Sequence, residues 1–334
     1  MGKVTGPRSG SMAYWPRKRA KRAYARIRSW PEYKDAQLLG FSGYKVAMTH
    51  VLLTDNRKNS TTKGSDINFP VTIIECPPIK ISSIMLYKKN PYGSKLVNQI
   101  NAKADKELAR KIKLPKKIDD KKKEELKAED YSDVRVLAYT QPKLTGIGKK
   151  KPELFELAIG GKSVEEKLNY AKEILGKEIA LKDVFGAGEQ VDFHVITKGK
   201  GFQGPVKRFG VKIRGRKSEK TKRGPGSLGP WCGQGHIMYR VAHAGQMGYH
   251  QRIEYNKVIL QIGEDGSSVT PKGGFNKYGD IKNPFIIVKG SIQGPSKRIV
   301  KFKKALRPNK KYNYGAPEIQ NISLISTQGT RKKA

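Results

Sequence analysis

The stretch of residues 199–252 limits most strongly how this chain can fold. Twelve of its positions are Lys or Arg, twelve are Gly, and Glu219 is its only acidic residue. Between positions 214 and 235 the only large apolar side chains are Leu228 and Trp231, so the segment cannot bury a core of its own. A basic, Gly-rich segment of this kind gains a fixed shape by binding a polyanion. We interpret 199–252 as a finger that enters folded RNA.

The charge of the whole chain supports a nucleic-acid partner. Among 334 residues, 68 are Lys or Arg and 29 are Asp or Glu, which gives a net charge of +39. Self-repulsion on this scale is tolerable in a compact protein when a polyanion supplies the counter-charge. A membrane surface is the competing polyanion, but the chain has no run of 18 or more apolar residues and no long amphipathic helix with one basic face. We therefore expect nucleic acid and no membrane.

The first 34 residues combine basic and aromatic side chains, and their first acid is Glu32. Basic side chains bind phosphates regardless of sequence, while aromatic rings either stack on exposed bases or fold back on the core. A mitochondrial transit peptide over residues 1–28 is the alternative, although Pro7 and Pro16 would interrupt its amphipathic helix. The cations that we expect to contact RNA here are Arg8, Arg17, Lys18, Arg19 and Arg22.

The N-terminus matches neither a secretory signal nor a lipid anchor. It lacks an apolar h-region, and Gly6 stands where myristoylation requires Ser or Thr. The two cysteines, Cys76 and Cys232, are too few for a disulfide framework. These features predict a cytoplasmic protein.

Short apolar and β-branched runs separated by turn residues predict many strands. The runs lie at 44–53, 70–75, 79–87, 134–139, 154–158, 191–195, 257–262, 285–289 and 298–302. Residues 94–130 form a region of helical composition, in which 99–112 is rich in Ala, Lys and Glu and 121–128 mixes both charges. The pattern predicts a mainly β fold with an α insertion (α+β), organised as a β-barrel rather than a doubly wound parallel sheet.

A capping box predicts one further helix. Ser163 is suited to the N-cap and Glu166 to the third helical position, and apolar residues at Leu168 and Ala171 then share one face. Gly176 would end the helix.

The sequence GKGFQG at 199–204 matches the GxGxxG dinucleotide fingerprint and follows a predicted strand. Pro205 stands where the required helix would begin, and no βαβ pattern follows, so we expect no nucleotide cofactor. We expect instead that the exposed glycine amides of this loop lie close to RNA phosphates. An RNA-modifying or nucleotide-dependent enzyme that uses the loop is the runner-up interpretation.

Cys232, His236, His243 and His250 do not have the paired close spacing of a zinc site, so we expect no metal. A Cys–His nucleophilic pair remains open, but no third orienting group is evident. His243 and His250 could contact phosphate or 2′-hydroxyl groups, and a structural role suits each equally well.

The finger supplies most of the residues that we expect to bind RNA. Leu228 is the only apolar neighbour of Trp231 in the loop sequence, so the tryptophan ring could stack on bases or wedge between them. The other candidates are Lys200, Lys207, Arg208, Lys212, Arg214, Arg216, Lys217, Lys220, Lys222, Arg223, His243, His250 and Arg252.

Several motifs resemble the universal large-subunit ribosomal protein L-three family, in its archaeal branch. They are TKGKGFQG at 197–204, AHAGQMGYH at 242–250, GYKVAMTH at 43–50, PRKRA at 16–20 and GGF at 273–275. The similarity extends over nearly the whole chain. Eukaryotic members have a modifiable histidine within Thr-His-Arg-Gly, whereas this chain has Lys222 at that position, so histidine methylation is not expected.

The resemblance implies a translation-protein-type β-barrel with a helical insertion, plus an N-terminal arm and a central finger that enter 23S rRNA. Its tip would comprise Gly229, Pro230, Trp231 and Cys232 and approach the peptidyl transferase centre, influencing A-site tRNA accommodation and elongation-factor binding. The family also implies a role in early subunit assembly and neighbours of the L-fourteen and L-twenty-four-e types.

The domain organisation that we expect has five parts. They are a basic extension (1–40), the first part of the barrel (41–93), a helical or α+β insertion (94–180), the second part of the barrel (181–305) and a C-terminal extension (306–334). The leading interpretation is a non-enzymatic, cytoplasmic constituent of the large ribosomal subunit. A DNA-binding or chromatin protein is the third alternative.

Overall fold

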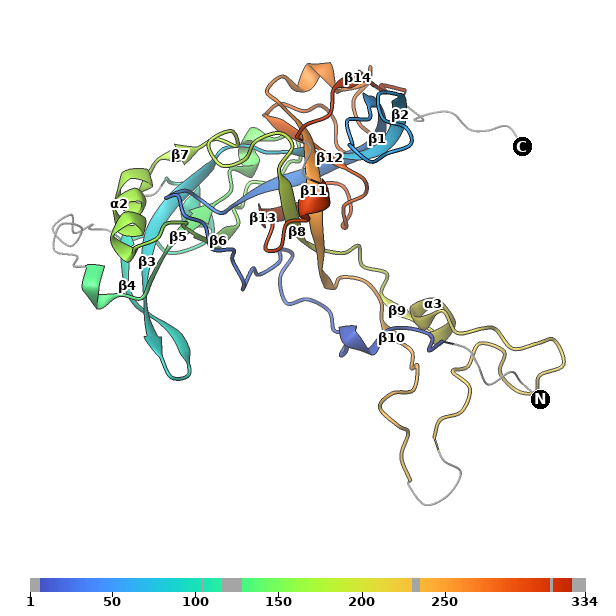
Figure 1. Ribbon diagram of the computed structural model, residues 1–334. Helices are drawn as coiled ribbons and strands as arrows, with labels where there is room; N and C mark the ends of the chain where they lie inside the picture. Colours follow the sequence, from blue (N-terminus) through green and yellow to red (C-terminus); the bar gives the residue numbers. More distant parts are fainter. Residues whose placement is uncertain (1–6, 104, 116–127, 230–234, 313–314, 326–334) are drawn as a thin grey trace. The chain divides into compact units, whose positions relative to one another are not determined.

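The computed structural model describes residues 7–103, 105–115, 128–229, 235–312 and 315–325. About 35% of the described residues are in strands and 11% in helices, which confirms the mainly β class. The residues fall into two compact groups. We call 1–23 with 196–251 the basic lobe, and 24–195 with 252–334 the body, and describe each by itself (Figure 1).

The larger sheet of the body has seven strands in the order β13-β8-β11-β12-β2-β1-β14. β1 also pairs antiparallel with β13, from Gly40 opposite Lys303 to Tyr44 opposite Ile299, so the pairings return to the first strand. The strands are β1 (Gly40–Thr54), β2 (Asp66–Glu75), β8 (Gln190–Ile196), β11 (Gln251–Gly263), β12 (Phe285–Lys289), β13 (Ile299–Lys304) and β14 (Ile319–Ile322).

The sequence predicted six of these seven strands. β1 and β2 pair antiparallel from Tyr44 opposite Glu75 to Thr54 opposite Asp66, as their β-branched composition indicated. β14 was missed because its four residues, Ile319–Ile322, alternate only weakly between apolar and polar. It pairs with the far end of β1.

The second sheet of the body consists of β3 (Ile79–Asn90), β4 (Gly93–Asn101), β5 (Asp133–Tyr139), β6 (Leu154–Ala158) and β7 (Glu178–Ile179). Its order is β4-β3-β5-β6, and β7 pairs with β3. β3, β5 and β6 cover the predicted strands.

The helix predicted over 99–112 is wrong. β4 runs through Asn101 instead, and among the described residues of 99–112 the only helical turn is the 3-10 turn η2 (Leu108–Arg110). Ile100 lies opposite Ile84 of β3 and is buried, so pairing and burial outweigh the helical propensity of this segment. Ala128 begins the 3-10 turn η3 (Ala128–Asp130), and the rest of the helix predicted over 121–128 lies outside the described residues. Within 94–180, the described residues hold most of β4 and all of β5, β6 and β7, together with the helix α2 (Val164–Ile174).

The predicted positions of Ser163 at the N-cap and Glu166 at the third helical position are confirmed in α2. The hydroxyl of Ser163 accepts a hydrogen bond from the Glu166 amide at 3.2 Å, and the Glu166 carboxylate accepts one from the Lys162 amide at 2.9 Å. Leu168 and Ala171 are buried, so the helix places one apolar face against the second sheet.

The main core of the body combines residues of both sheets with α2. At its centre the ring of Phe302 lies 5.1 Å from Phe185, 5.4 Å from Phe193 and 6.0 Å from Phe41, measured between centroids. The tilted rings fill this volume without stacking face to face.

In the basic lobe, β9 (Phe202–Gln203) pairs with β10 (Gly245–Gln246). The short helix α3 (Pro205–Phe209) follows β9 in the sequence. The expectation that Pro205 rules out a helix is wrong, because proline at the first helical position loses no intrahelical hydrogen bond. Gly248 is required in the lobe, since it has φ +73° and a Cβ there would lie 2.1 Å from the Lys198 carbonyl oxygen.

The remaining short elements are 3-10 turns. They are η1 (Met12–Tyr14), η4 (Pro142–Leu144), η5 (Gly266–Ser268) and η6 (Lys310–Tyr312). No helix within the described ranges is long and apolar enough to cross a membrane.

Candidate nucleic-acid interface

The N-terminal arm and the base of the finger come together around Phe209, the last residue of α3. Its ring is buried, with a centroid 5.8 Å from that of Trp15. The Arg17 guanidinium lies 4.3 Å from the same ring, a cation–π distance. Gly10, with φ +78°, allows the approach, because a Cβ there would lie 2.5 Å from Phe209. Two segments that are distant in sequence therefore share one small apolar centre.

Arg208 cross-links three parts of the lobe through backbone carbonyls. Its Nε donates to Gln246 O at 3.0 Å, its Nη1 to His243 O at 2.8 Å and its Nη2 to Arg17 O at 3.5 Å. Arg17 Nη1 donates in return to Arg208 O at 2.8 Å. Partial burial lowers the pKa of the Arg208 guanidinium, which nevertheless stays charged. These two arginines hold the segments of the lobe together and do not present their charge to a ligand.

His250 is also part of the framework. It is buried, its Nδ1 lies 2.8 Å from Lys18 O, and its amide donates to the Thr197 hydroxyl at 3.1 Å. Ala20 N donates to Tyr249 O at 2.8 Å beside this contact. The geometry therefore favours the structural alternative for His250. The ring of His243 is half-buried, and its carbonyl is the one that Arg208 binds.

Most of the other predicted cations are exposed. Arg252 is half-buried on β11 of the body, and Arg8 donates to Arg240 O while remaining exposed. The exposed group comprises Arg8, Lys18, Arg19, Arg22, Lys200, Lys207, Lys212, Arg214, Arg216, Lys217, Lys220, Lys222 and Arg223. Because Glu219 is the only acid in the two segments of the lobe, this surface is strongly positive.

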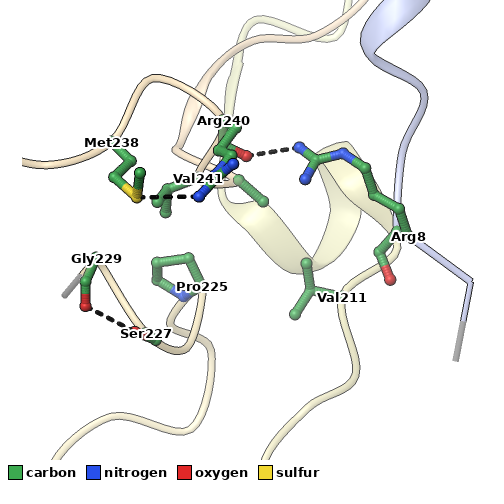
Figure 2. A pocket seen from close by; sticks show the side chains of 10 residues that line it. Arg8, Val211, Pro225, Ser227, Gly229, Met238, Arg240 and Val241 are labelled. Carbon is green, nitrogen blue, oxygen red and sulfur yellow. Dashed lines mark hydrogen bonds between the residues drawn. The ribbon is translucent and has the colours of Figure 1, made fainter. Parts of the chain in front are cut away.

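Near the tip, the two limbs of the finger are linked by a hydrogen bond from Met238 N to Leu228 O at 3.2 Å. Within the first limb, Arg214 N donates to Lys222 O at 3.1 Å. Between the limbs and the arm lies an open hollow of about 810 Å³, bordered by Arg8, Pro225 and Met238 (Figure 2). Its walls mix polar and apolar groups, which suits a surface that meets nucleic acid better than a closed small-molecule pocket.

The proposed finger tip is only partly visible. Gly229 is half-buried and has φ +151°, and its carbonyl accepts a hydrogen bond from the Ser227 hydroxyl at 3.2 Å. Pro230, Trp231 and Cys232 lie outside the described residues, so the predicted role of the tryptophan stays a prediction.

Two features of the lobe escaped the sequence analysis. Arg240 is a further exposed cation of the finger, and Phe202 is 77% exposed within the glycine loop. An aromatic residue flanked by glycines was the available signal for Phe202, but the dinucleotide pattern drew attention to the glycines alone.

The glycine loop has no dinucleotide-binding context. β9 lies inside the GxGxxG sequence and pairs antiparallel with β10, and α3 ends after five residues at Gly210. A dinucleotide site requires a parallel βαβ unit with a longer helix. Within the described ranges, no group of three or more His, Cys, Asp or Glu could hold a metal ion.

A mainly β body joined in one chain to a basic lobe with most of its cations at the surface is typical of proteins that assemble with RNA. Comparison with known proteins identifies the group. The sequence model of the family "Ribosomal protein L3" matches residues 1–330, and the chain belongs to this family.

Its relatives are large ribosomal subunit proteins uL3 of archaea. The protein of Methanocaldococcus jannaschii is 50% identical over 332 residues, covering 98% of each chain. That of Methanosphaera stadtmanae is also 50% identical, covering 97% of this chain and 98% of the relative. That of Methanococcus vannielii is 48% identical, covering 98% and 99%. The family consists of ribosomal proteins and not enzymes, which excludes the nucleotide-dependent enzyme alternative.

Proposed function

We propose that this protein is a structural constituent of the cytoplasmic large ribosomal subunit that binds 23S rRNA through its basic lobe. The observation that carries the proposal is that a few basic residues of the lobe bond within it while most of its cations are exposed. Arg17, Arg208 and His250 are used internally, while thirteen of the predicted cations are exposed on a surface with a single acid. Exposed cations neutralise phosphates and release counterions, which lets RNA helices pack closely.

The internal contacts refine how the lobe would bind. The base of the finger has its own apolar centre at Phe209, so it meets RNA partly organised, with a reduced entropic cost of binding. The exposed segment 211–223 has few contacts of its own and would take its shape from the RNA that surrounds it. The arm and finger thus act together instead of as two independent probes.

The finer points of the proposal rest on family resemblance. The returning strand pairings of the larger sheet would be the translation-protein-type β-barrel, with the finger extending to the peptidyl transferase centre. The finger would brace rRNA there without acid–base chemistry, and so influence A-site tRNA accommodation and elongation-factor binding. The body would support early assembly beside proteins of the L-fourteen and L-twenty-four-e types, and DNA would not be a partner.

A charge-removal series tests the rRNA interface. Lys212, Lys217, Lys220 and Lys222 are changed together to Gln, and affinity for 23S rRNA is measured between low and moderate salt. Because each phosphate contact contributes about 0.7–0.9 to the slope of log K against log salt, the slope should fall by about 3 to 4.

The matched control removes four exposed lysines beside acidic residues near α2: Lys162, Lys172, Lys177 and Lys182. It should leave the slope unchanged. Equal effects of the two variants would show that binding follows net charge alone and would refute a specific interface.

The tip is tested separately with Trp231→Ala. The body should stay folded, because Trp231 belongs to the finger, while ribosomes that carry the variant should be impaired in A-site tRNA binding. Wild-type assembly and translation would refute the tip role.

A further inference from the structure

The hairpin of β3 and β4 presents an aromatic side chain at its tip. The strands pair down to Asn90 opposite Gly93, which leaves Pro91 and Tyr92 as a two-residue turn. Tyr92 is 99% exposed, so its ring gains nothing from the body. Pro91 fixes its own φ and so restricts the backbone of the turn. Figure 1 shows the hairpin projecting from the second sheet.

The charges of this hairpin are of one sign. Lys88 lies directly opposite Lys95, and Lys89 lies opposite Ser94. Like charges directly opposite each other destabilise a strand pair. No Asp or Glu occurs in the sequence between Glu75 and Asp105, and no ion pair to these three lysines is found among the described residues. An anion bound between these lysines would relieve the repulsion.

The outer half of the hairpin is exposed on both faces. Every residue from 88 to 97 is exposed, including Leu96 and Val97. A two-stranded ribbon that is open on both faces is only marginally stable in water.

The inner half is anchored to the body. The Arg135 guanidinium lies 4.8 Å from the ring of Tyr87, and Asn98 Nδ2 donates to the Tyr131 hydroxyl at 2.6 Å. The base is therefore fixed while the tip is open to a ligand.

We propose that the β3–β4 hairpin is a second RNA-binding element, in which Tyr92 stacks on an unpaired base and Lys88, Lys89 and Lys95 bind the flanking phosphates. An exposed ring at a restricted turn, with lysines on both adjoining strands and no acid in the sequence of the hairpin, has the chemistry that recognises single-stranded or loop RNA. An acidic protein would satisfy the lysines but would leave the tyrosine ring without a comparable partner. The site belongs to the body, outside the basic lobe, and its assignment rests on the proposed rRNA-binding function.

Substitutions at the tip test the stacking. In binding assays of the full-length protein with 23S rRNA, Tyr92→Ala should weaken affinity about 5- to 150-fold, the range expected for loss of one base–aromatic stack, without changing the salt slope. Tyr92→Phe keeps the ring and should bind like the wild type. Equal losses for Tyr92→Ala and Tyr92→Phe, or none for either, would overturn the stacking.

Charge removal tests the phosphate contacts. Replacing Lys88, Lys89 and Lys95 together by Gln should lower the salt slope by about 2 to 3. The control, in which Lys162, Lys172 and Lys177 become Gln, removes the same charge beside acidic residues and should leave the slope unchanged. An unchanged slope in the hairpin variant would overturn the contacts.

Crosslinking identifies the class of partner directly. A photo-reactive phenylalanine analogue at position 92 should crosslink to 23S rRNA in assembled subunits, whereas the same group at the exposed Glu165 of α2 should not. Crosslinks from position 92 to ribosomal protein alone would overturn the RNA assignment. If the wild-type protein fails to bind rRNA, the proposed function itself is refuted. If the lobe variants lose affinity for rRNA and the hairpin variants do not, only the proposal for the hairpin is refuted.

Discussion

The basic lobe and the body use the same residue types in opposite ways. In the lobe the cations are mostly exposed, and the few that are enclosed, such as Arg208, bind backbone carbonyls. In the body, Lys45, Lys301, Lys303 and Lys304 are all buried on two neighbouring strands of the larger sheet. Composition alone would have grouped all of these side chains as candidates for phosphate binding.

The partners of the buried lysines explain the difference. Lys45 Nζ donates to the carbonyls of Ile292 and Gly294, and Lys303 Nζ donates to Ser29 O at 2.6 Å. Lys301 Nζ lies 4.1 Å from the centroid of the Phe155 ring. Burial lowers the pKa of Lys45 and of Lys303, since the charged form loses its hydration. A lysine enclosed in this way binds carbonyls or rings of the body itself and is lost to RNA binding.

The largest expected effect comes from the aromatic centre of the body. Phe302→Ala removes a fully buried ring that contacts three others, and it should lower the free energy of unfolding by about 3–5 kcal/mol. Denaturant titration of the free protein measures this. The matched ring in the lobe is Phe209, and Phe209→Ala should leave the main unfolding transition nearly unchanged while exposing the lobe to protease. Equal shifts in the main transition would break the distinction between the two regions.

A pH dependence would sharpen the account of the body. His194 is buried on β8 directly opposite Lys301 of β13, and neither of its ring nitrogens has a hydrogen-bond partner among the described residues. Burial, followed by the charges of Lys303 and Lys301, lowers the pKa of His194 from 6.5 to about 4. The unfolded chain therefore binds the proton first, so the stability that neutral His194 contributes is full above pH 6.5 and is lost as the pH falls toward 4.

The measurement is the free energy of unfolding at a series of pH values, compared with that of His194→Gln. The wild type should take up close to one proton more on unfolding between pH 4 and 6.5. Identical pH profiles would contradict a neutral, buried histidine at this position.

A smaller effect is expected at the arginine that links the parts of the lobe. Arg208→Gln removes the charged donors to His243 and Gln246 and should make local opening of the lobe easier by about 1–3 kcal/mol. Amide hydrogen exchange in residues 196–251 measures this opening, and exchange in the body should stay unchanged. Faster exchange throughout the body would contradict a local role, and normal exchange in the lobe would show that Arg208 is dispensable there.

The smallest effect is expected at the N-cap of α2. Ser163→Ala removes the hydrogen bond to the Glu166 amide and should lower the free energy of unfolding by about 1 kcal/mol, while Ser163→Asp should keep the stability because an aspartate also caps well. Thermal unfolding of the three proteins tests this. A larger loss than that of Phe302→Ala would overturn the ranking.

Local sequence signals were sufficient where neighbours in the chain satisfy one another. Ser163 and Glu166 predicted the start of α2 because both partners of the capping box lie within one turn. The strands β5 and β6 were predicted because their β-branched and apolar residues suit a pleated surface. The excess of positive charge likewise indicated a polyanionic partner without any knowledge of the fold.

Other features depended on residues far away in the chain. The segment 99–112 has helical propensity, yet Ile100 is buried opposite Ile84, and this pairing decides its conformation. No local pattern shows that Arg17 reaches Arg208 or that Lys303 reaches Ser29, since these contacts join positions 191 and 274 residues apart.

Thus the sequence by itself determined the mainly β class, the position of α2 and the polyanionic partner, because propensity and net charge are local or additive. Only the tertiary structure decided which cations are exposed for RNA and which are enclosed. That division depends on long-range packing, since burial removes a charge from solvent wherever distant segments close over it.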